Sequence, residues 1–195
     1  MIDPLHIAIP ESFNTPRLLL RPFALEDAGQ LHQALVESLA DLRANLWFLP
    51  WVAEEQTLQS AQVRCRKAQA NWLLRTDLAC LAFERSTGLL VASAGLHRTD
   101  WALPKTEVGY WVRSSQQRKG YASEAVGALT DWALNGLGAQ RVELVTDEHN
   151  TGSRGVALRA GFRLEGTLHH TMRAPDGQLR NTCVYAKLPA TVPKH

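Results

Sequence analysis

The segment Gln-Arg-Lys-Gly-Tyr-Ala at residues 117–122 has the residue types of a loop that binds a phosphate group. Gly120 and Ala122 are small, so a ligand can approach the backbone closely, and Arg118 and Lys119 add positive charge. A helix is expected to begin here, and the N-terminus of a helix presents unpaired N–H groups to an anion. The segment therefore predicts a diphosphate-binding loop, with a polar turn as the alternative. It matches neither Gly-x-x-x-x-Gly-Lys-Ser/Thr nor Gly-x-Gly-x-x-Gly, the loops of common nucleotide-binding folds.

The elements that position this loop follow from the spacing of apolar residues. The order along the chain is one strand, two helices, three strands, a helix, a strand, a helix and two strands. We expect the strands at 17–23, 78–84, 89–97, 105–113, 141–146, 162–173 and 178–188, and the helices at 25–40, 54–75, 120–137 and 151–160. This order predicts an α/β fold in which a mixed sheet carries helices on both faces.

The composition indicates one soluble domain. The chain has 195 residues, of which 45% are hydrophobic and 21% charged, as in ordinary globular proteins. Its net charge of +2 lacks the basic excess of a dedicated nucleic-acid-binding protein. No apolar run reaches the ~18–20 residues that span a bilayer, and no signal peptide is evident. We expect a single domain over residues 1–195, with an N-terminal arm at 1–14, of which the first dozen residues are loose, and the folded core at 15–188.

The three cysteines, Cys65, Cys80 and Cys183, are far apart in the sequence. Their odd number argues against a disulfide framework, and the absence of Cys-x-x-Cys spacing argues against a zinc site. We therefore predict no metal and a cytoplasmic, reducing location.

The phosphate-loop segment resembles motif A of the GNAT superfamily of acyl-CoA N-acyltransferases, Gln/Arg-x-x-Gly-x-Gly/Ala. Gln117, Gly120 and Ala122 match that motif. The preceding run 107–112 (Glu-Val-Gly-Tyr-Trp-Val) is similar to the fourth strand of the superfamily.

Two further segments extend the resemblance to residues 15–188. Asn150-x-x-Ser153-x-x-Val156, followed by Gly161-Phe162, resembles motif B of the same superfamily. The run 15–21 (Thr-Pro-Arg-Leu-Leu-Leu-Arg) resembles the opening strand of its Rim-type branch of ribosomal-protein N-acetyltransferases.

The resemblance implies a GNAT fold, in which a mostly antiparallel sheet is splayed between its fourth and fifth strands. Acetyl-CoA would be the cosubstrate, with its pantetheine arm in the gap between those strands. The arm would pair with backbone groups as an added strand does. The residues implied to bind the cosubstrate are Trp111, Val112 and Arg113 beside the pantetheine, Gln117, Arg118, Lys119, Gly120, Tyr121 and Ala122 around the pyrophosphate, and Asn150 and Ser153.

Acetyl transfer needs a neutral amine, donors for the thioester oxygen and a proton for the departing thiolate. Glu107 is the candidate for deprotonating the amine, and a salt bridge at the strand edge is the alternative interpretation. Asn150 and Ser153 begin a predicted helix, where capping is a sufficient role for both. The resemblance implies more: Asn150 would bond the pantetheine arm and Ser153 would protonate the thiolate. Many superfamily members use a tyrosine as that acid, but Ala157 stands at its position.

The acceptor is less well defined. Trp47, Trp51 and Trp101 are candidates for an aromatic wall around it, with core packing as the alternative. His97 is a candidate to line the same cleft. His169 and His170 are adjacent on a predicted strand, so their side chains point to opposite faces and cannot easily share a metal ion.

We expect an N-acetyltransferase that uses direct attack in a ternary complex, because no cysteine adjoins the proposed cleft in sequence. The acceptor would be a primary amine, either a protein N-terminus or a small molecule. Rim-type relatives often carry an aspartate where this chain has Asn181, which weakens a transfer of their substrate. The alternative is a non-catalytic acyl-CoA-binding module. No nucleic-acid or membrane partner is expected, and a homodimer is possible.

Overall fold

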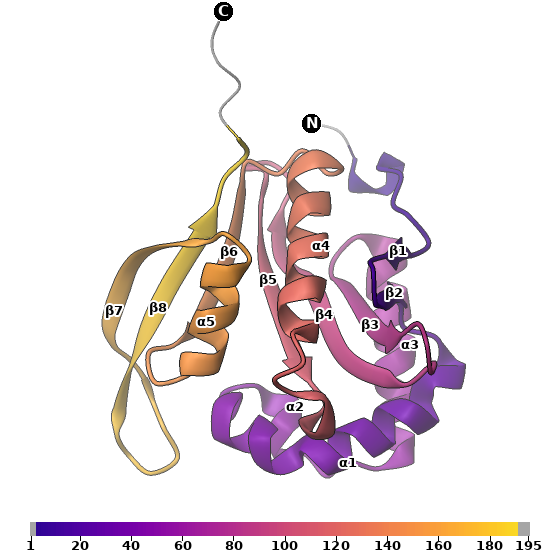
Figure 1. Cartoon of the computed structure of the whole chain (residues 1–195), viewed down its shortest axis with the longest axis horizontal. Coiled ribbons are helices and arrows are strands. Elements are labelled where there is room, and N and C mark those ends of the chain that lie inside the picture. Colours follow the sequence, from indigo (N-terminus) through magenta and orange to yellow (C-terminus); the bar gives the residue numbers. More distant parts are fainter. Residues whose placement is uncertain (1–2, 191–195) are drawn as a thin grey trace, which may run out of the picture.

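The computed structural model describes residues 3–190 and contains one sheet of eight strands (Figure 1). The strand order across the sheet is β1-β2-β3-β4-β5-β6-β8-β7. The strands are β1 (Phe13–Asn14), β2 (Leu18–Pro22), β3 (Leu78–Glu84), β4 (Leu90–Asp100), β5 (Lys105–Val112), β6 (Arg141–Asp147), β7 (Arg163–Arg173) and β8 (Leu179–Lys187).

Helices cover both faces of this sheet. One face is covered by α4 (Tyr121–Asn135), which contacts four strands, and by α5 (Thr151–Arg159). The other face is covered by α1 (Ala28–Asn45), the short α2 (Pro50–Ala53) and α3 (Leu58–Leu74). Three 3-10 turns, η1 (Pro4–His6), η2 (Leu25–Asp27) and η3 (Ser114–Gln116), complete the described elements. Figure 1 shows α4 running along the sheet and α1 crossing below the ends of the central strands.

Two hydrophobic clusters correspond to these two faces. The cluster under α4 and α5 contains Val126, Leu129 and Phe162 with alternate residues of the central strands. The cluster under α1 and α3 contains Leu31, Leu35 and Leu81. The apolar stripes read from the sequence therefore form the buried faces of the helices, as amphipathic periodicity predicts.

The sheet has one parallel pair, β5 and β6, and this pair separates along its length. Its register covers only Lys105–Glu107 against Arg141–Glu143, while β5 continues to Val112 and β6 to Asp147. All other neighbouring strands are antiparallel. Since β1 is an additional two-residue strand, β5 and β6 are the fourth and fifth strands expected from the sequence. The expectation of a mostly antiparallel sheet, splayed at this place, is confirmed.

The N-terminal arm differs from the loose segment that we expected. Phe13 pairs in β1 and its ring lies 4.7 Å from that of Trp132 in α4. Ile9 packs against the same core cluster, and the Ile7 carbonyl accepts a hydrogen bond from Arg75. Apolar side chains on both sides of a short polar stretch thus hold the described part of the arm on the domain, an effect of long-range packing that local spacing does not reveal.

Candidate active site

The open gap between β5 and β6 has backbone groups on one side that no strand pairs with. The Arg113 N–H donates to the Val91 carbonyl on β4 at 2.9 Å. Because hydrogen-bonding groups alternate along an antiparallel strand, Trp111 and Arg113 turn their backbone groups toward β4. Tyr110 and Val112 then turn theirs toward the gap. Of the three residues implied to pair with pantetheine, only Val112 offers its own backbone there, and Tyr110 joins it.

The predicted phosphate loop leads directly into α4. Gly120 is the N-cap residue of this helix, with φ of 85°, in the left-handed region that favours glycine. Arg118 also has a positive φ, of 60°. Residues 117–120 are exposed, so the first N–H groups of α4 adjoin solvent beside two cationic side chains. This arrangement fits a diphosphate through backbone donors, helix dipole and side-chain charge.

Arg17 braces the loop from behind. Its Nη1 donates to the Lys119 carbonyl at 2.8 Å, and its guanidinium pairs with Glu124 at 2.7 Å. The same guanidinium lies 4.8 Å from the ring centre of Tyr121, whose hydroxyl bonds Glu84. Glu124 also accepts bonds from the Thr15 hydroxyl and the Arg17 N–H. Burial opposes ionisation of Glu124, but these donors together hold its pKa below the usual value.

Two carboxylates of α1 fix the other end of the loop. Glu37 accepts bonds from Arg113 Nε at 2.6 Å and from the Ser115 N–H at 2.9 Å. Burial would raise the pKa of Glu37, yet these bonds lower it. Asp41 accepts a bond from the Gln117 side-chain amide at 3.0 Å. The side chains of Arg113 and Gln117 are therefore engaged within the protein, and they position the loop.

Asn150 and Ser153 lie at the start of α5, which follows the open end of β6. The Asn150 Oδ1 accepts a bond from the Ser153 N–H at 2.9 Å, so Asn150 caps the helix. Its amide nitrogen remains available to a ligand carbonyl. Burial raises the pKa of the Tyr110 hydroxyl, while the nearby Ser153 and Arg159 oppose that rise. Tyr110, on β5, therefore keeps a protonated phenol, and Ser153 is one of the groups that act on it.

Glu107 lies at the closed end of the gap, at the last paired position with Glu143. Its carboxylate forms an ion pair with Arg98, with a distance of 2.9 Å from Arg98 Nε. Its side chain is 15% exposed and that of Arg98 is 69% exposed. The structure thus contains the salt bridge that was the alternative interpretation of Glu107. The role of Glu107 as the base stays a prediction.

His97 and the three cysteines are the next residues that the sequence analysis considered. His97 Nδ1 lies 2.6 Å from Asp77, and its ring covers Gly95 and Gly109. Among residues 3–190, no group of His, Cys, Asp and Glu side chains is arranged to hold a metal ion. Cys65, Cys80 and Cys183 are all buried, and burial raises the pKa of Cys65 to about 11. Thiols of this kind stay protonated and are poor nucleophiles.

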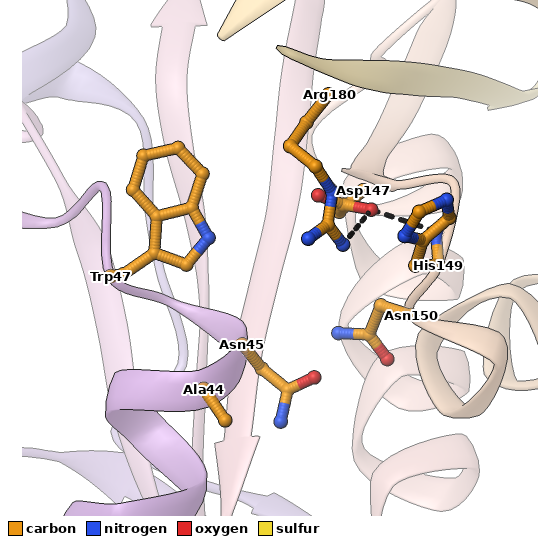
Figure 2. Close-up of a pocket in the computed structure, with 7 residues that line it drawn as sticks. All are labelled: Ala44, Asn45, Trp47, Asp147, His149, Asn150 and Arg180. Atoms are coloured by element: carbon orange, nitrogen blue, oxygen red, sulfur yellow. Dashed lines mark hydrogen bonds and ion pairs between the residues drawn. The ribbon is translucent and has the colours of Figure 1, made fainter. Parts of the chain in front are cut away.

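A small cavity of about 50 Å³, open to solvent, lies between the end of α1 and the ends of β6 and β8. Figure 2 shows side chains of α1 and the following turn on one side, and those of β6, the turn before α5 and β8 on the other. The lining residues are Ala44, Asn45, Trp47, Asp147, His149, Asn150 and Arg180. Asn150 links this cavity to the gap. Of the three tryptophans considered above, Trp47 lines the cavity, while Trp51 and Trp101 pack against the hydrophobic clusters.

The sequence matches the model of the acetyltransferase (GNAT) domain over residues 17–163. The chain belongs to this family. The uncharacterized N-acetyltransferase p20 of Bacillus licheniformis is 27% identical over 179 residues, which cover 91% of this chain and 96% of that protein. Another relative, from Bacillus subtilis, is matched over 57% of its own length.

Solved structures show the same GNAT fold. Mycobacterium smegmatis RimJ, in complex with CoA-disulfide, has a TM-score of 0.79 and 24% identity, covering 91% of this chain and 84% of that one. A RimL ribosomal L7/L12 α-N-protein acetyltransferase in complex with coenzyme A has a TM-score of 0.79 and 22% identity, covering 92% and 97%. The expectations of a GNAT fold, of acetyl-CoA as cosubstrate and of N-acetyltransferase activity are confirmed, and the Rim-type proteins share this fold.

Several residues of this GNAT site have roles that sequence reasoning did not assign. Arg17 and Glu124 are 107 positions apart, and Glu37 and Arg113 are 76 apart, so no local pattern connects them. Arg17 belongs to the run 15–21 that resembles Rim-type proteins, which was the only available signal.

In the part of the chain that the structure describes, no helix is both long and apolar enough to cross a membrane.

Proposed function

We propose that this acetyltransferase modifies the α-amine of a protein or of a smaller acceptor, by direct attack on acetyl-CoA in a ternary complex. The observation that carries the proposal is the gap between β5 and β6. The N-terminus of α4 lies beside one end of this gap, and the cavity around Trp47 adjoins the gap at Asn150. A cosubstrate and an acceptor can therefore approach the same point from different sides. We place the reaction in the cytoplasm, in keeping with three buried, unpaired cysteines.

The cosubstrate would lie along β5. The pyrophosphate would bind the N–H groups at Gly120, Tyr121 and Ala122, with Arg118 and Lys119 supplying charge. The pantetheine would pair with the backbone of Val112 and Tyr110, and Trp111 and Arg113 would fix the position of that strand. Asn150 would donate its amide N–H to a carbonyl of the arm. A free backbone N–H of β5 would also stabilise the negative charge that develops on the thioester oxygen.

Ser153 would donate a proton to the thiolate as the carbon–sulfur bond breaks. Its hydroxyl lies near Tyr110, which is protonated at neutral pH and can replace the proton. The tyrosine that many superfamily members carry on α5 is Ala157 here, and Tyr110 approaches Ser153 from the opposite strand.

An α-amine is the acceptor that the chemistry favours. Its unperturbed pKa is about 8, against about 10.4 for lysine, so more of it is neutral at physiological pH. The RimL structure belongs to an α-N-protein acetyltransferase, which agrees with such an acceptor. Asn181 bonds Glu148 at 2.8 Å and stands where Rim-type proteins often have an aspartate, so the acceptor protein need not be theirs.

The proposal is tested by following release of the CoA thiol with a panel of α-amines, lysine side-chain amines and polyamines. We expect transfer to α-amines, and a fall of about tenfold to hundredfold in kcat for Ser153→Ala, with an unchanged KM for acetyl-CoA. Thr151→Ala, on an exposed residue of the same first turn, is the matched control. Binding of acetyl-CoA without transfer to any amine would instead indicate a non-catalytic acyl-CoA-binding module.

A further inference from the structure

We propose that Asp147 and Arg180 select the acceptor by binding an α-amino acyl group, meaning an amine whose neighbouring carbon carries a carbonyl or carboxylate. Peptide N-termini and free amino acids share this group, whereas alkylamines and polyamines lack it. The inference rests on the proposed function, because it requires an amine acceptor in the cavity around Trp47.

Asp147 is the last residue of β6 and is only 6% exposed. Its Oδ1 accepts two hydrogen bonds, from the His149 N–H at 2.7 Å and from Arg180 Nη2 at 2.9 Å. Its Oδ2 is buried and has no hydrogen-bond partner among the described residues. A buried carboxylate oxygen without a donor is unfavourable, and most such atoms in proteins are paired. Oδ2 is therefore suited to receive an N–H from an amine, which must move the Arg180 guanidinium aside to reach it.

Arg180, on β8, supplies the complementary half of the pair. Its side chain is 20% exposed, and its only hydrogen bond among the described residues goes from Nη2 to Asp147. Its Nε is buried without a partner. The guanidinium therefore retains donors for a carbonyl or carboxylate oxygen. Figure 2 shows it between Asp147 and the Trp47 indole, on the cavity side of the carboxylate.

The two groups adjoin each other, as do the amine and the carbonyl of an α-amino acyl group. Binding that group would satisfy both an acceptor and a donor that the protein leaves unpaired. A plain alkylamine would satisfy only Asp147 and would leave the remaining N–H donors of Arg180 without an acceptor. Discrimination of this kind is strong, because the unmet polar group is held in a buried site.

The rest of the cavity fits a small acceptor group. Its volume of about 50 Å³ lies far below the roughly 300–1,000 Å³ of typical ligand pockets, so it admits only the amine end of an acceptor. Trp47 provides an apolar wall, and Asn45 provides polar contact from the end of α1 (Figure 2). Asn150 places the cavity next to the pantetheine path.

A purely structural role explains the pair less well. Backbone pairing already fixes β6 against β8, with Asp147 opposite Thr182. Buried ion pairs stabilise a fold poorly unless their remaining atoms are also bonded. Here each partner has a buried atom that is not bonded.

The test compares rates of acetyl transfer to glycinamide, to a short peptide, to free glycine and to propylamine. After each rate is divided by the fraction of the amine that is neutral at the assay pH, the native protein should prefer the α-amino acyl compounds over propylamine by about tenfold or more. Asp147→Asn and Arg180→Lys should each raise KM for those compounds and reduce this preference. Their KM for acetyl-CoA should stay close to native. Glu165→Gln, which removes an exposed carboxylate from the Arg141 ion pair outside the cavity, is the matched control and should change none of these values.

A second variant guards against misfolding of the buried pair. Ala44 lines the cavity from an exposed position near the end of α1, so Ala44→Phe fills the cavity without altering the core. It should raise KM for every amine while acetyl-CoA still binds. A higher rate with the peptide than with free glycine would identify a protein N-terminus as the source of the group, and the reverse would identify an amino acid.

The outcomes separate this inference from the proposed function. Equal rates with glycinamide and propylamine, unaltered by Asp147→Asn and Arg180→Lys, would overturn the inference and leave the transferase intact. Absence of transfer to every amine would overturn both.

Discussion

The two sides of the gap between β5 and β6 differ in how their charged groups are used. On the cosubstrate side, Arg17 and Arg113 are paired with carboxylates, and those pairs hold the loop in place. On the acceptor side, Asp147 and Arg180 are paired with each other but keep buried atoms without partners. The first side is a rigid support for a ligand whose chemistry is constant. The second side has unmet polar groups that a particular acceptor can satisfy.

This difference follows from what each side must recognise. A diphosphate is bound by backbone N–H groups and by the helix dipole, so the side chains around it are free to act as braces. An acceptor is distinguished by hydrogen bonds made or missed in a buried site, so side chains must face it directly. The cosubstrate side therefore contains the family motifs named above, whereas Asp147, Arg180 and Trp47 on the acceptor side lie outside those motifs.

The largest effect should come from breaking the cosubstrate side at Gly120. Gly120→Glu places a carboxylate where we propose that the pyrophosphate binds, in a backbone conformation with φ of 85° that disfavours any side chain. We expect the affinity for acetyl-CoA, measured by calorimetry, to fall by about a hundredfold or more. A Cβ at this position would lie 3.2 Å from the flexible Arg17 Nη2, so the fold should persist.

Gly120→Ala is the control for the backbone effect without the charge. It should weaken binding much less than the glutamate does. Equal affinities of the native protein and Gly120→Glu would show that the pyrophosphate binds elsewhere.

The cosubstrate side could be proposed from the sequence because its determinants are local. Gly120, Ala122, Asn150 and Ser153 act through short spacing and through the ends of helices, and both are visible in one dimension. Even so, the alternation of backbone groups along β5 depends on its pairing with β4. The sequence therefore suggested Trp111, Val112 and Arg113 equally, where the structure turns only Val112 of these three toward the gap.

The acceptor side was less predictable because its residues meet only in the tertiary fold. Asp147 and Arg180 are 33 positions apart, and Trp47 lies much earlier in the chain, just after α1. Nothing in their local spacing distinguishes Trp47 from Trp51 or Trp101. The packing of Ile9 in the expected loose arm was missed for the same reason, since its contacts with the core are long-range.

An intermediate effect should follow from Glu107, which lies between the two sides at the closed end of the gap. If Glu107 accepts the proton of the amine, Glu107→Gln should lower kcat by about tenfold. Arg98→Gln frees the carboxylate from its ion pair and should preserve kcat. Equal losses in the two variants would assign both residues to a structural salt bridge. This comparison decides whether Glu107 acts in catalysis or only in the ion pair with Arg98.

The smallest effect concerns the brace itself. Glu124→Gln should weaken three hydrogen bonds to Thr15 and Arg17 and lower the free energy of unfolding by about 1–2 kcal/mol at pH 7. Because the pKa of Glu124 is lowered in the folded protein, its stabilisation is present above the unfolded value near 4.3 and is lost as the pH falls through the folded value. Denaturation curves of the native protein and the variant should therefore differ at pH 7 and converge in acid. A constant difference across this range would mean that the carboxylate acts by packing and that charge pairing does not hold the loop.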